Sequence, residues 1–154
     1  MTQIDATDAR LLRLVQQDGA MTVQQLAEAV HLSASACHRR LQRMEREGVL
    51  LGRVALLDAR RVGRGTTAYV EVSLASQADE VLDAFERAVA RIEDVLECHL
   101  MTGAYDYLLK VAVRDTEHFA QVHRARLARL PGVARIQSSF SLRTVCQTTA
   151  LPVG

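Results

Sequence analysis

Hydrogen-bond donors are concentrated between Leu32 and Gly48, in the sequence LSASACHRRLQRMEREG. Read as a helix, this segment has one apolar stripe, and its opposite face is polar and basic. The stripe consists of Ala34, Cys37, Leu41 and Met44, and the outward face of Ser35, Arg39, Gln42 and Arg46. Guanidinium, hydroxyl and amide groups are the donors that major-groove base edges and phosphates accept. We therefore predict a DNA-recognition helix, with a merely solvated basic face as the alternative.

The expected DNA contacts divide into base contacts and backbone contacts, because only base edges carry sequence information. The N-cap of the helix and the start of the preceding helix add polar side chains to the set. Base edges are expected to contact Ser35, His38 and Arg39, phosphates to contact Arg40 and Arg43, and Gln24, Gln25 and Ser33 to complete the DNA-binding surface.

The segments before and after this helix complete a small DNA-binding domain over residues 1–57. Asp5 and Thr22 are N-cap residues for two further short helices, and the connection to Ser33 is short enough for a helix-turn-helix. After Gly48, two apolar runs flank Gly52 and predict a small hairpin. This hairpin would be the wing of a winged helix-turn-helix domain.

Residues 58–65, DARRVGRG, have little to bury and are expected to be a linker. Residues 66–154 then show a different periodicity, in which alternating or continuous apolar strands are separated by two helical patterns. The expected order is strand 67–74, helix 81–92, strand 95–102, strand 107–113, helix 116–130 and strand 133–143. This βαββαβ order predicts a ferredoxin-like domain and an α+β protein, with the helices on one sheet face. The other face is expected to bind a ligand or a second subunit.

The chain has 154 residues, of which 49% are hydrophobic and 24% charged, with a formal net charge of +1. Residues 1–64 hold ten Arg against seven acids, and residues 65–154 hold nine cations against eleven acids. This excess is too small for tight DNA binding by charge alone, so base contacts or several copies are needed. No apolar run suggests a membrane span or signal peptide, and the three cysteines are expected to be reduced, which favours the cytoplasm.

Several segments together resemble the Lrp/AsnC family of bacterial and archaeal regulators. They are LSASACHRRLQRMEREGVL, ECHLMTGAYDYLLKV and LPGV, in a chain that joins a helix-turn-helix to a ferredoxin-like half. The resemblance covers nearly the whole chain. It implies a transcriptional regulator whose C-terminal domain forms dimers that assemble further, often to octamers, and senses small molecules, usually amino acids.

The resemblance also implies an effector site between dimers, close to the turn that follows ECHLMT. Its residues here would be Gly103, Tyr105, Asp106 and Tyr107, with Ser139 and Ser141 on the last strand. Chemistry supports a turn site, because glycine lets backbone N–H groups approach a carboxylate and a carboxylate accepts from an ammonium. The alternative is structural: the glycine turns a hairpin, the aspartate caps it and Tyr107 belongs to the core. Ala104 stands where an acidic residue is common in the family.

Catalysis and metal binding are less favoured. In Glu97-Cys98-His99 the thiol and imidazole would lie on opposite faces of a strand and cannot meet. His118 and His123 lack metal-ligand spacing, and no cofactor is expected. The sequence therefore predicts a non-enzymatic, sequence-specific regulator that binds double-stranded DNA and an amino acid, as a homodimer assembling to an octamer. An architectural protein that wraps DNA with weak sequence preference and no effector is the alternative.

Overall fold

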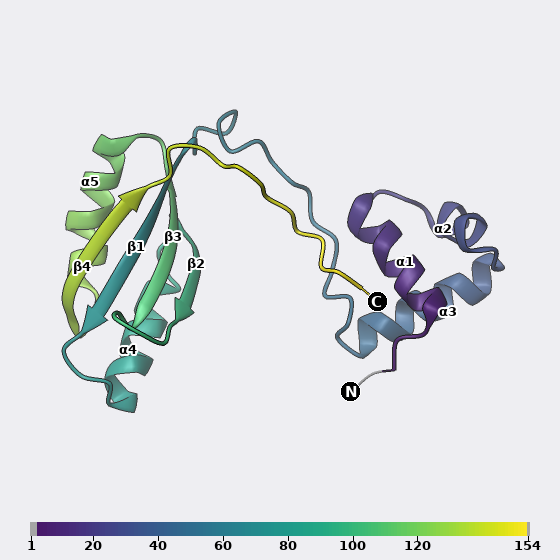
Figure 1. The fold of residues 1–154 in the computed structure, drawn as a ribbon, viewed down its shortest axis with the longest axis horizontal. Helices are drawn as coiled ribbons and strands as arrows, with labels where there is room; N and C mark the ends of the chain where they lie inside the picture. The colour runs from purple at the N-terminus through teal and green to yellow at the C-terminus, as the bar shows by residue number, and fades with distance from the viewer. Residues whose placement is uncertain (1–2, 154) are drawn as a thin grey trace. The chain divides into compact units, whose positions relative to one another are not determined.

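The computed structural model describes residues 3–153, which form two compact units (Figure 1). The first unit is the chain up to Leu56 together with the segment that begins at Cys146, and the second is Leu57–Val145. The sequence pattern predicts that residues 66–154 form a single domain. In the structure the end of that stretch packs on the first unit, because its contacts are with α1 rather than with the sheet.

The first unit contains three helices (Figure 1), and each begins at a side-chain cap. They are α1 (Ala6–Gln17), α2 (Val23–Val30) and α3 (Ala34–Arg46). The predicted caps Asp5, Thr22 and Ser33 accept from the backbone N–H three residues later, at 2.8, 3.2 and 3.2 Å. Leucines, valines and the Cys37 and Met44 side chains fill the core between them. Ala34, assigned to the apolar stripe, is exposed at the first turn instead.

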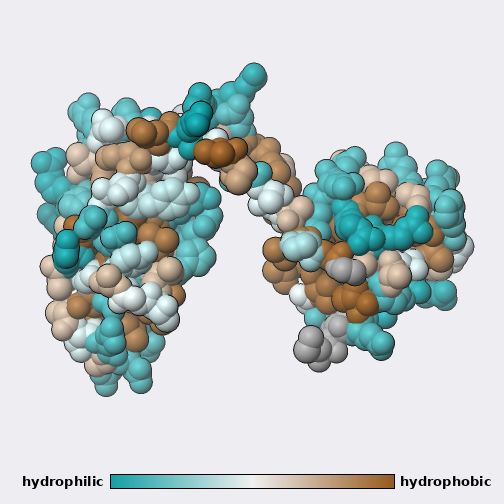
Figure 2. All heavy atoms as spheres, in the orientation of Figure 1, coloured by the Kyte–Doolittle hydropathy of each residue, from teal (hydrophilic) through white to brown (hydrophobic). Residues whose placement is uncertain are grey.

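The predicted wing is wrong, because the structure has no strand between Gly48 and Gly65. The backbone N–H groups of Val49 and Leu50 both donate to the carbonyl of Met44, which folds these two residues back onto the helical core. Residues 51–58 are exposed and have no helix or strand, and residues 59–63 form a turn. Hydrophobic side chains therefore lie at the surface of the extended segments (Figure 2).

The C-terminal tail, Cys146–Val153, lies against α1. The Gln16 side chain accepts from the Leu151 N–H at 2.7 Å and donates to the Leu151 carbonyl at 3.1 Å. Arg13 donates to the Val153 carbonyl at 2.8 Å, and the Val153 side chain packs against the helical core. The tail is thus part of the helix-turn-helix unit.

The second unit has the predicted βαββαβ order with a four-stranded antiparallel sheet, β2-β3-β1-β4. Its elements are β1 (Thr66–Leu74), α4 (Asp79–Val89), β2 (Val95–Leu100), β3 (Tyr107–Val113), α5 (Thr116–Ala125), a 3-10 turn (Leu127–Arg129) and β4 (Val133–Phe140). Both helices cover the same face of the sheet (Figure 1). Among residues 3–153, no helix is long and apolar enough to cross a lipid bilayer.

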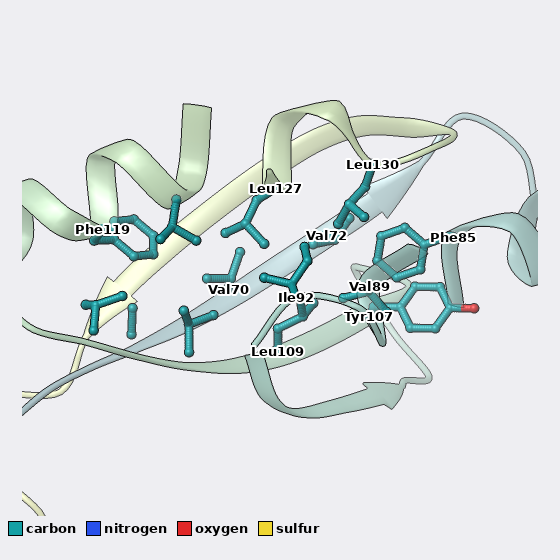
Figure 3. Close-up of a cluster of buried hydrophobic side chains, with 14 residues drawn as sticks. Val70, Val72, Phe85, Val89, Ile92, Tyr107, Leu109, Phe119, Leu127 and Leu130 are labelled. Carbon is teal, nitrogen blue, oxygen red and sulfur yellow. The ribbon is translucent and has the colours of Figure 1, made fainter. Parts of the chain in front are cut away.

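The covered sheet face is apolar and the opposite face is polar. Val70 and Val72 of β1 lie opposite Leu109 and Tyr107 of β3, and all four are buried beneath the helices (Figure 3). Phe85 of α4 packs on Tyr107 with ring centroids 4.4 Å apart. Tyr69, Glu71, Lys110, Gln137 and Ser139 lie on the other face by strand alternation. The predicted amphipathic sheet is confirmed.

Gly132 offers a stability test, because a Cβ there would lie 2.4 Å from Cγ1 of Val81 and its φ is +72°. We expect Gly132→Ala to lower the free energy of unfolding by about 2–4 kcal/mol, through backbone strain and the clash together. Gly63 has the same φ and open space around it, so Gly63→Ala should cost only about 1 kcal/mol. Chemical denaturation measures both values. If the two variants lose the same free energy of unfolding, the contact with Val81 does not contribute to the loss.

Candidate functional site

The outward face of α3 presents the predicted base-contacting residues. Ser35, His38 and Arg39 are all exposed on this helix. Among the described residues, Arg39 has no hydrogen bond or ion pair, so its guanidinium is available for a ligand. Ser35 shares a 3.2 Å hydroxyl contact with Ser33, whose hydroxyl also caps the helix. This face can donate to acceptors on a base edge or a phosphate.

Two other predicted residues lie at the start of α2 and are exposed. The Gln25 side chain accepts from the Thr22 N–H at 2.8 Å, which completes a capping box. Gln24 is 3.5 Å from a carboxylate oxygen of Glu28. The amide N–H₂ of Gln25 remains free to donate, so its cap role and a phosphate contact are compatible.

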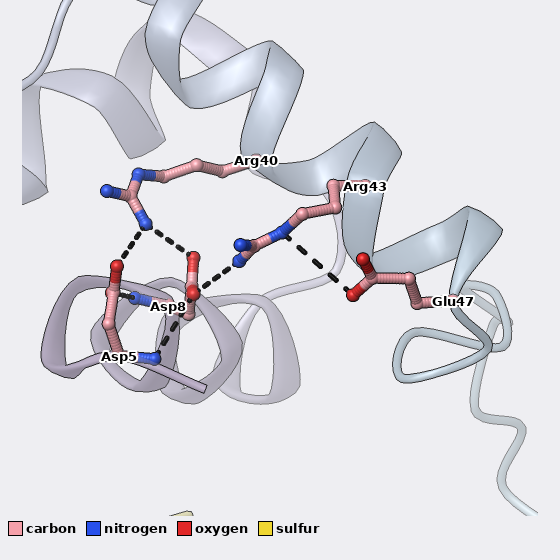
Figure 4. A network of polar contacts seen from close by, with 5 residues as sticks. All are labelled: Asp5, Asp8, Arg40, Arg43 and Glu47. Atoms are coloured by element: carbon pink, nitrogen blue, oxygen red, sulfur yellow. Dashed lines mark hydrogen bonds and ion pairs between the residues drawn. The ribbon is translucent and has the colours of Figure 1, made fainter. Parts of the chain in front are cut away.

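Arg40 and Arg43, predicted to hold phosphates, are instead tied to α1 (Figure 4). Nη1 of Arg40 lies 2.6 Å from the Asp5 carboxylate and 2.9 Å from the Asp8 carboxylate. Nη2 of Arg43 lies 2.5 Å from the other oxygen of Asp8, and its Nε is 4.0 Å from Glu47. The side chain of Asp8 is 0% exposed. Both guanidiniums therefore neutralise a buried carboxylate, which gives each of them a structural partner. Their contact with phosphates stays a prediction.

The electrostatics of the network agree with this role. The hydrogen bond from the Asp8 N–H and the guanidinium of Arg40 hold the pKa of Asp5 below its usual value. The same carboxylates raise the pKa of Arg40. Sequence reasoning missed the network, although it carries a signal: acids three apart begin α1, and arginines three apart lie on α3. When acids on one helix and arginines on another have the same spacing, they can form two ion pairs where the helices cross.

The turn between β2 and β3 is built by Asp106 and Tyr107. The Asp106 carboxylate accepts from the Leu74 N–H and from the Gln77 amide, both at 2.7 Å. Tyr107 is buried, and its hydroxyl donates to Glu86 at 2.8 Å. Burial and the Glu86 carboxylate raise the pKa of Tyr107. These side chains hold the turn in place, as the structural alternative expected, and the Tyr107 ring belongs to the core.

Among the predicted residues of this turn, Gly103 is the exposed one. Gly103 is exposed with a φ of +122°, a conformation that favours glycine, and no atom lies within 4 Å of its missing Cβ. Tyr105 is half-buried. An amino-acid carboxylate could therefore approach the backbone at this position.

Ser139 and Ser141 do not meet the turn within one chain. Ser139 lies opposite Tyr69, and Ser141 donates its N–H to Thr67, both at the beginning of β1. The turn lies at the end of β1, where Asp106 binds the backbone of Leu74. The effector site is expected between dimers, so the role of these two serines stays a prediction. The antiparallel register separates them by about 15 Å or more along the sheet.

Asp8→Asn tests the buried network. We expect it to lower the free energy of unfolding by about 2–4 kcal/mol, because Arg40 and Arg43 lose their shared anion while remaining charged. Asp83→Asn is a matched control, since it breaks an exposed pair with Arg87 at 3.8 Å and should cost less than about 0.5 kcal/mol. The free energy of unfolding is measured in thermal or denaturant unfolding. Similar decreases for both variants would show that the ion pairs of Asp8 do not stabilise the fold.

Two family models match the chain, one over its N-terminal part and one over its C-terminal part. Residues 4–45 match the AsnC-type helix-turn-helix domain, and residues 67–151 match the Lrp/AsnC ligand binding domain. No cluster of three potential metal ligands exists among the described residues. The matched models thus name a DNA-binding half and a ligand-binding half.

Relatives extend along almost the whole chain. The DNA-binding transcriptional activator DecR of Escherichia coli K12 is 37% identical, over 97% of this chain and 99% of the relative. The leucine-responsive regulatory protein of the same strain is 33% identical, over 97% and 92%. The crystal structure of transcriptional regulator NMB0573 from Neisseria meningitidis, in complex with L-Met, has a TM-score of 0.92 at 35% identity and covers 97% of each chain. This chain belongs to the Lrp/AsnC family of DNA-binding transcriptional regulators.

Proposed function

We propose that this regulator acts on DNA in the cytoplasm as a dimer that assembles further, and that an amino acid bound at the β2–β3 turn controls that assembly. Arg39 on α3 is exposed and has no ion pair with any residue from 3 to 153, and this observation most directly supports sequence-specific binding. Dimers would present two α3 helices, one helical turn or more apart, to a partly palindromic operator. An octamer would multiply these contacts and bend the DNA.

The base-reading residues in this proposal are Ser35, His38 and Arg39. Gln24, Gln25 and Ser33, whose side chains are exposed, add contacts to the DNA backbone. Arg40 and Arg43, 32% and 36% exposed, hold phosphates through the guanidinium N–H groups that Asp5 and Asp8 leave free. The uncovered face of the β-sheet supports pairing of two copies, because an open sheet face in a small domain favours a partner.

The effector contacts in this proposal come from the backbone near Gly103 and from the half-buried Tyr105. The neighbouring structure with L-Met and the relative named leucine-responsive support an amino acid as the class of ligand. Asp106 and Tyr107 set the shape of the turn. Ser139 and Ser141 can join such a site only from a second copy, which agrees with an effector held between chains. The architectural alternative is less favoured, because the matched relatives are named as regulators.

Arg39→Ala tests the base-reading role. We expect affinity for the operator to fall by about 1–3 kcal/mol while affinity for random DNA changes much less, so that sequence preference relaxes. Arg87→Ala, an exposed arginine on α4, should change neither affinity and serves as control. Fluorescence anisotropy with both DNAs over a salt series measures this. A uniform loss on every sequence, with a lower salt slope, would make Arg39 a phosphate contact.

An amino-acid screen tests the sensor. We expect one amino acid, with methionine and leucine first, to raise the melting temperature and change the light-scattering mass, because a ligand stabilises the state it binds. Gly103→Val should abolish the response, since a β-branched residue resists a φ of +122°. If none of the twenty alters stability, assembly or DNA affinity, the amino-acid part of the proposal is wrong.

A further inference from the structure

The C-terminal tail is held on α1 by a small number of contacts near the surface. Gln16 uses both atoms of its side-chain amide on the backbone of Leu151, at 2.7 and 3.1 Å, and Arg13 donates to the Val153 carbonyl at 2.8 Å. Exposed hydrogen bonds contribute little each, because water competes for the same groups. The tail can therefore leave α1 at a modest cost in free energy.

Apolar surface adds to these hydrogen bonds. The Val153 side chain packs against the helical core of the first unit. Residues 151–153 also line a groove together with Leu12 and Val15 of α1. Release of the tail removes this apolar cover, so the docked and released states differ in the stability of α1.

A continuous set of contacts leads from the tail to the recognition helix. The tail binds Arg13 and Gln16 toward the C-terminal end of α1. In the first turn of the same helix, Asp8 binds Arg40 and Arg43 of α3. Helix α1 is thus held by α3 at one end and by the tail at the other. Loss of the tail contact would increase fraying of the helix that carries the buried carboxylate.

The other end of the tail continues from the ligand-binding half. The Ser141 N–H donates to the Thr67 carbonyl at 2.9 Å, which joins the segment after β4 to the start of β1. Residues 142–150 then have no helix or strand and are exposed. Binding of a ligand or a second copy at the end of β4 therefore acts on the segment that leads directly to the tail.

We propose that the tail contact couples the ligand-binding half to the recognition helix: the docked tail stabilises α1 and thereby α3, and its release weakens DNA binding. The trigger rests on the proposed amino-acid response, because the proposed effector residues Ser139 and Ser141 lie just before this segment. The effect of the tail on α1 and on DNA binding does not depend on that response. Coupling is reciprocal, so DNA binding also strengthens the docking of the tail.

Hydrogen exchange of the 154-residue chain tests the tail contact, with Gln16→Ala and Gln17→Ala as a matched pair. Both replace a glutamine of α1 with a better helix former, but of the two only Gln16 has a hydrogen bond to the tail within residues 3–153. We expect the amides of α1 and of Leu151 to exchange about tenfold faster in Gln16→Ala and at the original rate in Gln17→Ala. The amides of β1 and β3 should not change in either. Equal exchange of α1 in the two variants overturns the proposal.

DNA binding tests the coupling, with a duplex selected from random sequences for tight binding as the probe. We expect Gln16→Ala, and Val153→Ser on the tail itself, to lower the affinity about three- to tenfold, and the bound duplex to slow exchange of the Leu151 N–H. The combined variant should lose no more than the larger single loss, because a released tail has no second contact to lose. Unchanged affinity in both single variants overturns the coupling.

Methionine and leucine separate this inference from the proposed function. If either binds, it should still raise the melting temperature of Gln16→Ala, but its effect on DNA affinity should be smaller than in the original chain. An equal effect on DNA affinity would show that the signal does not pass through the tail, which overturns the proposal. If neither binds, methionine and leucine are excluded as effectors, and the exchange and DNA measurements still decide whether the tail controls α3.

Discussion

A buried carboxylate on the first helix governs the DNA-binding unit. Asp8 has no exposed side-chain surface, and a buried charge without partners costs several kcal/mol, so both arginines that reach it are needed. Both arginines come from α3, which ties the recognition helix to α1 at two successive turns. Separating the two helices would expose unpaired charges on both sides. The outward residues of α3 are thereby held at a fixed angle to the rest of the unit.

The same principle orders the ligand-binding half. Asp106 accepts one hydrogen bond from the last residue of β1 and one from the segment that follows, and Tyr107 donates one to α4. The turn is therefore fixed by the sheet on one side and by a helix on the other. Gly103 is exposed at this turn, and no atom lies within 4 Å of its missing Cβ.

Local patterns predicted most of the fold, because caps and apolar periodicity are properties of neighbouring residues. The caps Asp5, Thr22 and Ser33 and the alternation in β1 are examples. The predicted wing failed because two apolar runs around Gly52 resemble a hairpin whether or not they pair. Long-range contacts set the rest: the partners of Arg40 lie more than thirty residues away, and strand register alone decides where Ser139 lies.

The tail bound to α1 has a consequence for how the chain is made. Translation proceeds from the N-terminus, and a domain commonly folds as it leaves the ribosome. Here the helix-turn-helix emerges first, but Gln16 and Arg13 receive their partners from Leu151 and Val153 after the whole ligand-binding half has been synthesised. The DNA-binding unit is the first to begin folding and the last to be completed. A nascent chain cannot present the finished unit to DNA before its sensor half exists.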